Sequence, residues 1–310
     1  MGLTKAPVAV GAPRLAAADA LLLAWFAEHG RHDLPWRRTR DPWAVLVAEM
    51  MLQQTQVSRV IPRYQQFLRR FPTVIACAQA SPGAVIEEWQ GLGYNRRALN
   101  LWRAAGVAVA RFDGELPRSL ADLLTLPGVG AYTARAICAF AHEHHVGVVD
   151  TNVARVLART EGRALNRAEA QALADQAVPP GQAWAWNQAL MDLGSQHCRS
   201  RGPQCPTCPI RRHCAWSGSQ QNPSVTSAHL AAVDPAVGSA GTSRSQSPFA
   251  GSDRQGRGRL VAALRAGPVR AAEVAHIMGW PQDPERANRV AATVLADGLA
   301  QLDDGHYRLP

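Results

Sequence analysis

Apolar residues recur at intervals of three and four from Leu15 to about His197, and this periodicity constrains the fold more than any other feature. It is the spacing of amphipathic helices, whereas the alternation typical of strands is scarce. Prolines and glycines interrupt the pattern repeatedly, from Pro35 to Pro179-Pro180. Because such residues end helices, the pattern predicts roughly ten short helices and an all-α fold.

The composition changes after Trp216. Residues 217–255 are rich in serine, glycine and proline, which predicts a flexible linker. Helical periodicity returns from Gly256 to Pro310 and ends in a turn at Asp304-Gly305. We therefore expect three helices and a hairpin, a small winged-helix-like module. A structural cap without a ligand explains this segment equally well, because its charge is nearly neutral and phosphate binding requires basic residues.

The charge of the chain favours a polyanionic partner. The formal net charge is +9, and an excess of eight basic residues precedes Ser217. The longest nearly apolar stretch, Leu15 to Phe26, is too short to span a membrane, and Asp19 interrupts it. The N-terminus lacks the pattern of a signal peptide. We expect a cytoplasmic protein that does not enter a membrane.

Lys5 is the only lysine, and all other basic residues are arginines. A Schiff-base mechanism needs a lysine amine held in the active site. Lys5 lies in a leader, residues 1–13, that is rich in Pro, Ala, Gly and Val. The sequence therefore argues against covalent catalysis by lysine.

Four cysteines lie within seventeen residues in the pattern C-x6-C-x2-C-x5-C. They are Cys198, Cys205, Cys208 and Cys214. Disulfides are rare in the cytoplasm, so this density indicates a metal site. Zinc and a [4Fe-4S] cluster both accept four thiolates, and the spacing alone leaves both open. Cys77 and Cys138 stand alone in helical stretches, and we interpret them as packing residues.

Two glycine-containing loops connect predicted helices. In Leu126–Ala134, the backbone N–H groups of Gly128, Val129 and Gly130 can approach an anion at a helix N-terminus. This arrangement is typical of a helix-hairpin-helix, which binds DNA phosphates without reading sequence. The second loop, Gly91–Tyr94, carries an aromatic residue at its tip. Tyr94 either inserts between bases or packs on its own loop.

Glu49 is the most informative single residue, because it interrupts the otherwise apolar stretch Trp43–Leu52. A carboxyl group there is a cap, an ion-pair partner or a functional group, and burial would suit it to general acid catalysis. Gln53 and Gln54 follow and offer hydrogen bonds to bases. Asp150 precedes a predicted helix start, where aspartate is an ordinary N-cap.

Glu49 and Asp150 together provide the two carboxyl groups that glycosidic hydrolysis requires, one as proton donor and one as anion. Combined with a phosphate-binding hairpin and a basic surface, this chemistry points to cleavage of N-glycosidic bonds in DNA. The target nucleotide must then flip out of the helix. Gln53 and Tyr94 could fill the space that it leaves.

At these residues the sequence resembles the helix-hairpin-helix DNA glycosylases, and among them the adenine DNA glycosylases of the MutY type. The resemblance runs from about Leu34 to Trp216. The motifs that carry it, besides the cysteine spacing, are Leu34–Arg37, Glu49–Val57, Gly91–Tyr94, Leu126–Gly130, Val149–Val153 and Asn187–Gly194.

The resemblance implies a six-helix barrel at 43–148, a cluster domain built from 14–42 and 149–216, and one [4Fe-4S] cluster on the four cysteines. Glu49 would then protonate adenine, and Asp150 would stabilise the cationic sugar, with Asn152 and Tyr132 nearby. Residues that match the adenine pocket are Trp36, Arg37 and Asp192. The implied partner is double-stranded DNA with adenine mispaired with 8-oxoguanine or guanine, bound by a monomer in a bacterial nucleoid.

The chain departs from related families in two respects. Relatives of the endonuclease III type place a lysine where this sequence has Tyr132, so we expect base removal without efficient strand cleavage. Many adenine glycosylases carry a Nudix-like domain that recognises 8-oxoguanine, and residues 256–310 are too few for it. We expect these residues to contact DNA or a repair protein instead, although no motif identifies such a partner.

Two other functions remain open from the sequence. One is a glycosylase with another target, such as oxidised pyrimidines or mismatched thymine, against which the motif around Glu49 argues. The other is a catalytically silent cluster protein that binds DNA as a redox or damage sensor.

Overall fold

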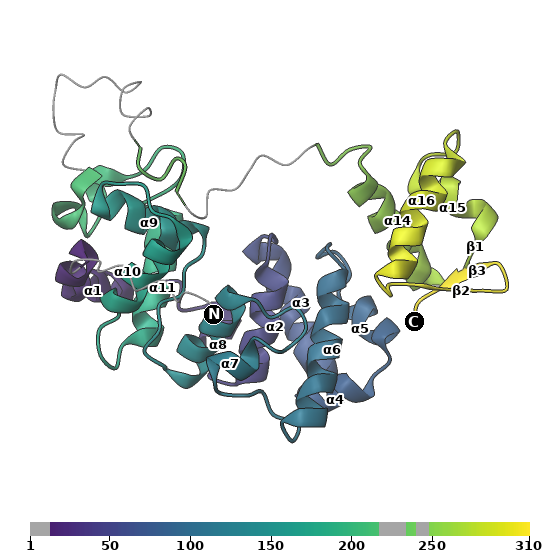
Figure 1. Ribbon diagram of the computed structural model, residues 1–310, viewed down its shortest axis with the longest axis horizontal. Helices are drawn as coiled ribbons and strands as arrows, with labels where there is room; N and C mark the ends of the chain where they lie inside the picture. Colours follow the sequence, from purple (N-terminus) through teal and green to yellow (C-terminus); the bar gives the residue numbers. More distant parts are fainter. Residues whose placement is uncertain (1–12, 217–233, 240–247) are drawn as a thin grey trace, which may run out of the picture. The chain divides into compact units, whose positions relative to one another are not determined.

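The computed structural model describes residues 13–216, 234–239 and 248–310, which divide into two compact units (Figure 1). Unit 1 comprises the chain up to Asp33 and Ala134–Arg244, and unit 2 comprises Leu34–Thr133 and Ser245–Pro310. The expected leader at 1–13 and most of the expected linker at 217–255 lie outside the described residues. No helix in the described ranges is long and apolar enough to cross a membrane.

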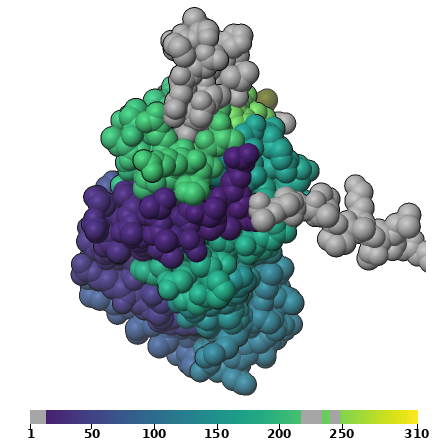
Figure 2. Space-filling model, turned by 90° about the vertical axis from the view of Figure 1, so that its left-hand side faces the viewer, coloured from purple at the N-terminus to yellow at the C-terminus, as the bar shows by residue number. Residues whose placement is uncertain are grey.

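Unit 1 is helical, as the periodicity predicts. Its elements are η1 (Arg14–Ala18), α1 (Asp19–His29), the larger part of α8 (Ala131–His142), α9 (Thr151–Glu161), α10 (Arg167–Ala177), α11 (Ala183–Gln196), η3 (Cys205–Thr207) and η4 (Arg211–His213). Leu15, Leu22 and Phe26 from the N-terminal segment share one buried core with Leu157 of α9 and Trp186 of α11. Figure 2 shows this segment, in purple, lying against later parts of the chain.

Unit 2 contains the remaining helices of the first two-thirds of the chain. These are η2 (Pro35–Arg37), α2 (Pro42–Leu52), α3 (Val57–Arg70), α4 (Val74–Gln79), α5 (Pro82–Glu88), α6 (Arg96–Arg111), α7 (Leu120–Leu123) and the first turn of α8. Every residue of α2 from Trp43 to Met51 is buried, so α2 is the central helix of this unit. The Asp41 carboxylate caps its N-terminus by accepting from the backbone N–H groups of Trp43 and Ala44.

The C-terminal module, residues 248–310, belongs to unit 2. It contains α14 (Asp253–Ala266), β1 (Val269–Arg270), η5 (Ala271–Glu273), α15 (Val274–Met278), α16 (Pro284–Ala296), β2 (Gln301–Asp303) and β3 (His306–Arg308). The three expected helices and the hairpin are confirmed. The strands form an antiparallel sheet in the order β1-β3-β2, which is a winged-helix arrangement with one strand, β1, that the sequence pattern did not indicate.

The helix-hairpin-helix is present as α7, the loop Leu124–Gly130 and α8. Its two glycines, Gly128 and Gly130, differ in backbone conformation and in surroundings. Gly128 has a left-handed backbone with φ of 78°, and a Cβ atom there would lie 2.7 Å from Cβ of Asn100. Nothing lies within 4 Å of the corresponding position at Gly130.

We predict that Gly128→Ala lowers the free energy of unfolding by about 2 kcal/mol, because the side chain adds left-handed strain and overlaps Asn100. Gly130→Ala is the matched control and should change that free energy by less than about 0.5 kcal/mol. Denaturant midpoints of the two variants provide the comparison. Equal effects of the two substitutions would contradict this account of the loop.

Candidate active site and cysteine pocket

Glu49 lies in the penultimate turn of α2 and is buried, with 6% of its surface exposed. It is the one carboxylic acid in an otherwise apolar helix. Its helix ends three residues later at Leu52, where Gln53 begins a loop. A buried acid one turn from an accessible loop is the arrangement that proton donation to a bound ligand requires.

Arg97, near the start of α6, connects that loop to a second one. Its Nη1 atom lies 2.8, 2.9 and 2.6 Å from the carbonyl oxygens of Met50, Met51 and Gln53. Its Nη2 atom donates to the hydroxyl of Thr55, and also to the carbonyls of Leu92 and Gly93, both at 3.1 Å. One buried guanidinium therefore caps the C-terminus of α2 and joins the loop after α2 to the loop before α6.

These two loops carry the residues that the sequence suggested for base contacts. Gln54 and Tyr94 both have left-handed backbones, with φ of 54° and 44°, which side-chain-bearing residues rarely adopt. Tyr94 is 46% exposed, and the Arg97 guanidinium lies 5.5 Å from the centre of its ring. The structure thus brings Gln53, Gln54 and Tyr94 onto neighbouring loops. The sequence did not indicate the role of Arg97, because its acceptors are backbone carbonyls far away in the chain.

Trp36 and Arg37, two of the expected base-pocket residues, lie in η2 and are buried. The ring of Trp36 meets Tyr64 edge-on at 5.5 Å between centroids. Tyr132 lies in the first turn of α8, directly after the glycine hairpin, and is half-buried. The expected site residues of unit 2 therefore lie on four elements, which are η2, the end of α2, the α5–α6 loop and the glycine hairpin.

In unit 1, Asp150 is the N-cap of α9, so its capping role is confirmed. One carboxylate oxygen accepts from the backbone N–H of Val153 at 2.7 Å, and the other accepts from Nδ2 of Asn152 at 2.9 Å. Arg155 in turn donates to Oδ1 of Asn152 at 2.8 Å, which fixes the amide. Burial raises the pKa of Asp150, and these hydrogen bonds only partly oppose the shift.

Asp192, the third expected pocket residue, is fully buried in α11 and holds Arg31. It accepts from the backbone N–H of Arg31 at 2.9 Å and from Nε at 2.8 Å. Because Arg31 follows α1, this pair ties the N-terminal segment to α11.

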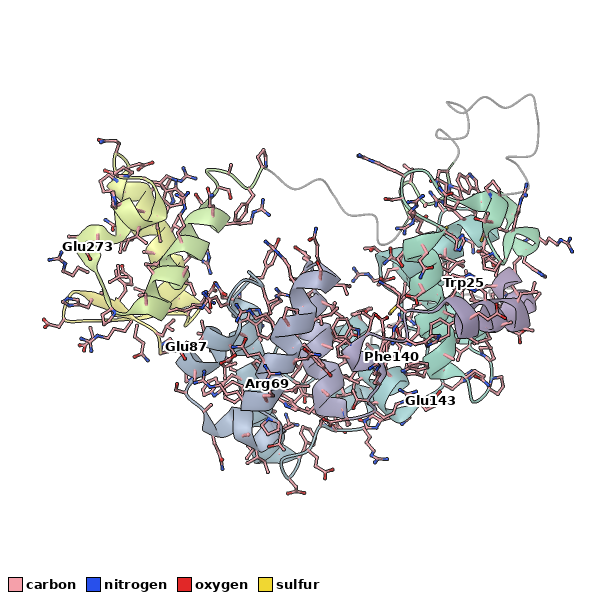
Figure 3. The ribbon with its side chains drawn as sticks, turned by 180° about the vertical axis from the view of Figure 1, so that it is seen from behind. Trp25, Arg69, Glu87, Phe140, Glu143 and Glu273 are labelled. Atoms are coloured by element: carbon pink, nitrogen blue, oxygen red, sulfur yellow. The ribbon has the colours of Figure 1, made fainter. Side chains whose placement is uncertain are left out.

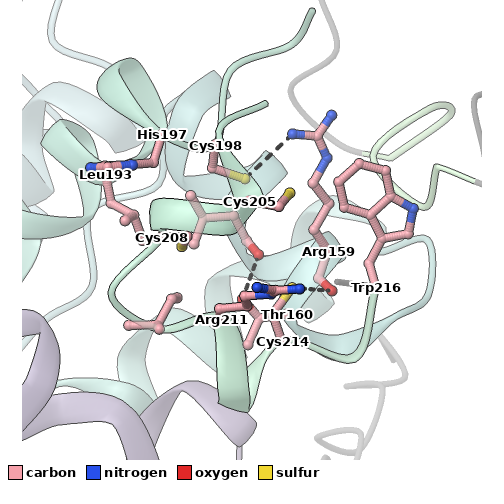
Figure 4. A pocket seen from close by; sticks show the side chains of 12 residues that line it. Arg159, Thr160, Leu193, His197, Cys198, Cys205, Cys208, Arg211, Cys214 and Trp216 are labelled. Atoms are coloured by element: carbon pink, nitrogen blue, oxygen red, sulfur yellow. Dashed lines mark hydrogen bonds between the residues drawn. The ribbon is translucent and has the colours of Figure 1, made fainter. Parts of the chain in front are cut away.

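The four clustered cysteines line one pocket, together with Leu193, Ile210 and Trp216 (Figure 4). They lie at the end of α11 and around the short helices η3 and η4. The described residues include no group of three or more His, Cys, Asp or Glu side chains suited to a single metal ion. Cys77 and Cys138 are buried elsewhere, as expected of packing residues.

Arg159 of α9 also lines this pocket and is 2% exposed. Its Nη1 atom lies 3.4 Å from Sγ of Cys198 and donates to the carbonyl of Arg199 at 2.8 Å. Its guanidinium stacks on Trp216 at 4.4 Å and pairs with Asp234, with Nη2 at 2.6 Å from Oδ2. Asp234–Ser239, inside the segment expected as a linker, thereby pack on unit 1.

Comparisons with known proteins agree with this arrangement. The family model described as HhH-GPD superfamily base excision DNA repair protein matches residues 47–180. An adenine DNA glycosylase of Mycolicibacterium smegmatis is 40% identical over 296 residues, covering 93% of this chain and 94% of the relative. The adenine DNA glycosylase of Homo sapiens is 40% identical over 208 residues, covering 62% of this chain and 38% of the relative.

Solved structures show the same fold. A thermostable thymine-DNA glycosylase has a TM-score of 0.62 at 28% identity, covering 66% of this chain and 97% of the other. Endonuclease III in a trapped covalent DNA complex has a TM-score of 0.57 at 23% identity, covering 66% and 94%. The chain belongs to the HhH-GPD superfamily of base excision DNA repair proteins. Within that superfamily it is a DNA glycosylase of the MutY type.

We predict that Asp234→Ala lowers the free energy of unfolding of unit 1 by about 3 kcal/mol, because it leaves the Arg159 guanidinium buried without its carboxylate. The control is Arg163→Ala, which removes the ion pair with Glu169 from a side chain that is 47% exposed and should cost less than about 1 kcal/mol. Denaturant unfolding followed by circular dichroism measures both. A loss of unfolding free energy no larger than that of the control would show that the ion pair of Asp234 does not stabilise unit 1.

Proposed function

We propose that the protein removes adenine mispaired with 8-oxoguanine or guanine from DNA, and that it leaves the strand intact at the resulting abasic site. The observation that carries this proposal is Glu49, a buried acid in an otherwise apolar helix, one turn from the loop that contains Gln54. The adenine DNA glycosylases that cover nearly all of the chain support the choice of adenine.

In this proposal the two carboxyl groups have different tasks. Glu49, buried near the end of an otherwise apolar helix, donates a proton to adenine and makes it a better leaving group. Asp150 is the anion that stabilises the positive charge developing on the sugar. Asn152 holds the Asp150 carboxylate, and Tyr132 contacts the reacting sugar. Water completes the hydrolysis.

DNA binding is assigned to the loops of unit 2. The N–H groups of Gly128, Val129 and Gly130 bind a backbone phosphate at the N-terminus of α8. Gln53, Gln54 and Tyr94 enter the DNA double helix and fill the gap that the flipped adenine leaves. The exposure and the strained backbone of Tyr94 support this role.

Residues assigned to the adenine pocket are Trp36, Arg37 and Asp192. Trp36 offers an aromatic ring and Arg37 a guanidinium from one short helix. Asp192 acts through Arg31, because both of its carboxylate oxygens accept from that residue.

The four cysteines of the pocket are proposed to hold one [4Fe-4S] cluster. Their thiolates are the donor set that such a cluster takes, and the pocket walls contributed by Leu193, Ile210 and Trp216 are apolar enough to shield it. When bound, the cluster would supply a rigid cross-link between the end of α11 and the following loop. Arg159, close to Cys198, would offset part of the negative charge of the thiolates.

The substrate assay tests the central proposal. Purified protein is incubated with end-labelled duplexes containing adenine opposite 8-oxoguanine, guanine or thymine, and strands are scored with and without alkali. We expect cleavage only after alkali and fastest opposite 8-oxoguanine. Strand cleavage without alkali at the rate of base loss would overturn the absence of lyase activity, and no base loss in any duplex would overturn the choice of adenine.

Glu49→Gln separates the enzyme from a silent DNA-binding sensor. This variant keeps the shape of the side chain but cannot donate a carboxylic proton, so we predict at least about a hundredfold loss of base excision with DNA affinity retained. Gel-shift binding and single-turnover excision measure the two quantities. Retained excision would exclude Glu49 as the acid.

The pH dependence of excision tests Asp150, which must be ionised to act. Because burial raises its pKa, activity should fall on acidification at a higher pH than an ordinary aspartate would allow. The Asn152→Ala variant loses a hydrogen bond that favours the ionised form of Asp150. The pKa of Asp150 should therefore rise further, and the acidic limb of the pH profile of kcat should move to higher pH. Thr151→Ala, an exposed neighbour, is the control. Coincident limbs in both variants would contradict this role.

A further inference from the structure

The C-terminal module lies against the helices that flank the Tyr94 loop. Within unit 2, α14 and α16 approach α5 and α6 (Figure 1), and Figure 3 shows Glu87 of α5 on the side that faces the module. The surface that the module covers is therefore not the glycine hairpin but the pair of helices on either side of the loop Trp89–Tyr94.

One arginine of the module holds both ends of this loop. Arg265, in the last turn of α14, donates from Nε and Nη2 to the carbonyl oxygen of Ile86, at 3.2 and 3.1 Å. Its Nη2 atom also donates to Oδ1 of Asn95 at 2.9 Å. Ile86 lies in the last turn of α5, before the loop, and Asn95 is the N-cap of α6, after it. A cation at a helix C-terminus is electrostatically favourable, so Arg265 also stabilises the end of α5.

The hydrogen bonding of the Asn95 side chain indicates that the contact with Arg265 shapes the loop. Asparagine at an N-cap normally accepts a hydrogen bond from the backbone of its own helix. Here the Asn95 side chain makes no capping hydrogen bond and accepts from Arg265 instead. The side chain of the residue directly after Tyr94 is therefore held by the module rather than by its own helix.

Other contacts hold the module on the same two helices. Asp297, the C-cap of α16, lies 3.4 Å from Nη1 of Arg96 and also pairs with Arg257. An acidic residue at a helix C-terminus is unfavourable by itself, and these two arginines account for its position. At the other end of α5, the carbonyl of Pro310 accepts from the backbone N–H of Gly83 at 2.7 Å.

Glycines allow this close approach. A Cβ atom on Gly83 would lie 2.5 Å from the carbonyl oxygen of Pro310. A Cβ atom on Gly298 would lie 3.1 Å from Nη2 of Arg103 and 3.3 Å from a methyl group of Leu99, both on α6. The module thus contacts α5 and the first half of α6 at several points and not at a single one.

We propose that the C-terminal module positions the Trp89–Tyr94 loop for reading the base opposite the target adenine, with Arg265 as the positioning residue. This inference rests on the proposed function, in which Tyr94 enters the DNA. Asn95, Arg96 and Arg97 follow Tyr94 directly, and the first two are held by the module while Arg97 is held by the end of α2. Tyr94 therefore projects from a loop that is fixed on both sides.

The first test uses the full-length protein without DNA. Hydrogen–deuterium exchange is measured for Arg265→Gln and for Arg270→Gln, a control that removes the same charge from an exposed pair within the module. We expect amides of residues 89–97 to exchange about tenfold faster in Arg265→Gln, because a charged hydrogen bond is lost. Exchange in α2 and α3, and in the control, should match the wild type.

The double variant Arg265→Gln/Asn95→Ala and the single variant Asp297→Asn complete this test. If Arg265 acts through Asn95, the double variant should exchange no faster than the faster of its two single variants. Asp297→Asn weakens the contact from another point and should accelerate the same amides. Unchanged exchange at 89–97 in Arg265→Gln, or acceleration spread evenly over unit 2, would overturn the proposal.

The second test is the ratio of single-turnover excision rates of adenine opposite 8-oxoguanine and opposite guanine. Arg265→Gln should reduce this ratio several-fold, and Arg270→Gln should leave it unchanged. An unchanged ratio despite faster exchange in the loop would overturn the role in base reading. If the wild type excises no adenine, the proposed function fails, while the exchange experiment still decides whether Arg265 positions the loop.

Discussion

The buried guanidinium of Arg97 is the interaction on which the arrangement of the loops proposed to contact DNA depends. It lies among six acceptors, five of which are backbone carbonyls at the end of α2 and in the loop before α6. Without it the buried carbonyls of Met50, Met51 and Leu92 would lose this donor, at a cost of about 1–3 kcal/mol for each group left unsatisfied. The left-handed backbones of Gln54 and Tyr94 cost about 1–3 kcal/mol each, and such strain persists only where the surroundings impose it. Arg97 supplies this constraint, because it donates to the carbonyls of Gln53 and Gly93, the residues directly before Gln54 and Tyr94.

Two other arginines also hold several acceptors with one guanidinium group. Arg265 does so on the other side of the loop, and Arg159 does so at the cysteine pocket. Each of the three uses a planar fork to reach acceptors from different segments, which an ammonium group on a flexible stem would not do equally well. The near absence of lysine is therefore more than a matter of composition. It accompanies a structure in which distant segments are joined by guanidinium groups, both in unit 2 and around the thiols of unit 1.

Local patterns in the sequence were sufficient for much of the fold. Periodicity predicts the helices, the glycine pair predicts the hairpin between α7 and α8, and the position of Asp150 before α9 predicts its cap. Interactions between residues far apart in the chain were not predictable. Arg97, Arg265 and Asp234 are ordinary polar residues in their own segments, and their partners are 4–47, 170–179 and 75 residues away. The strand β1 was missed because two residues carry no period.

The ion pair between Arg159 and Asp234 brackets all four clustered cysteines in the sequence. Closing this stretch of chain confines the thiols to a small volume, and the entropy of doing so is met by folding and not by the group that the thiols bind. The fold thereby raises the local concentration of the four thiols. Their relative positions depend in part on a pair of charges that contains no sulfur and lies outside the cysteine segment in the sequence.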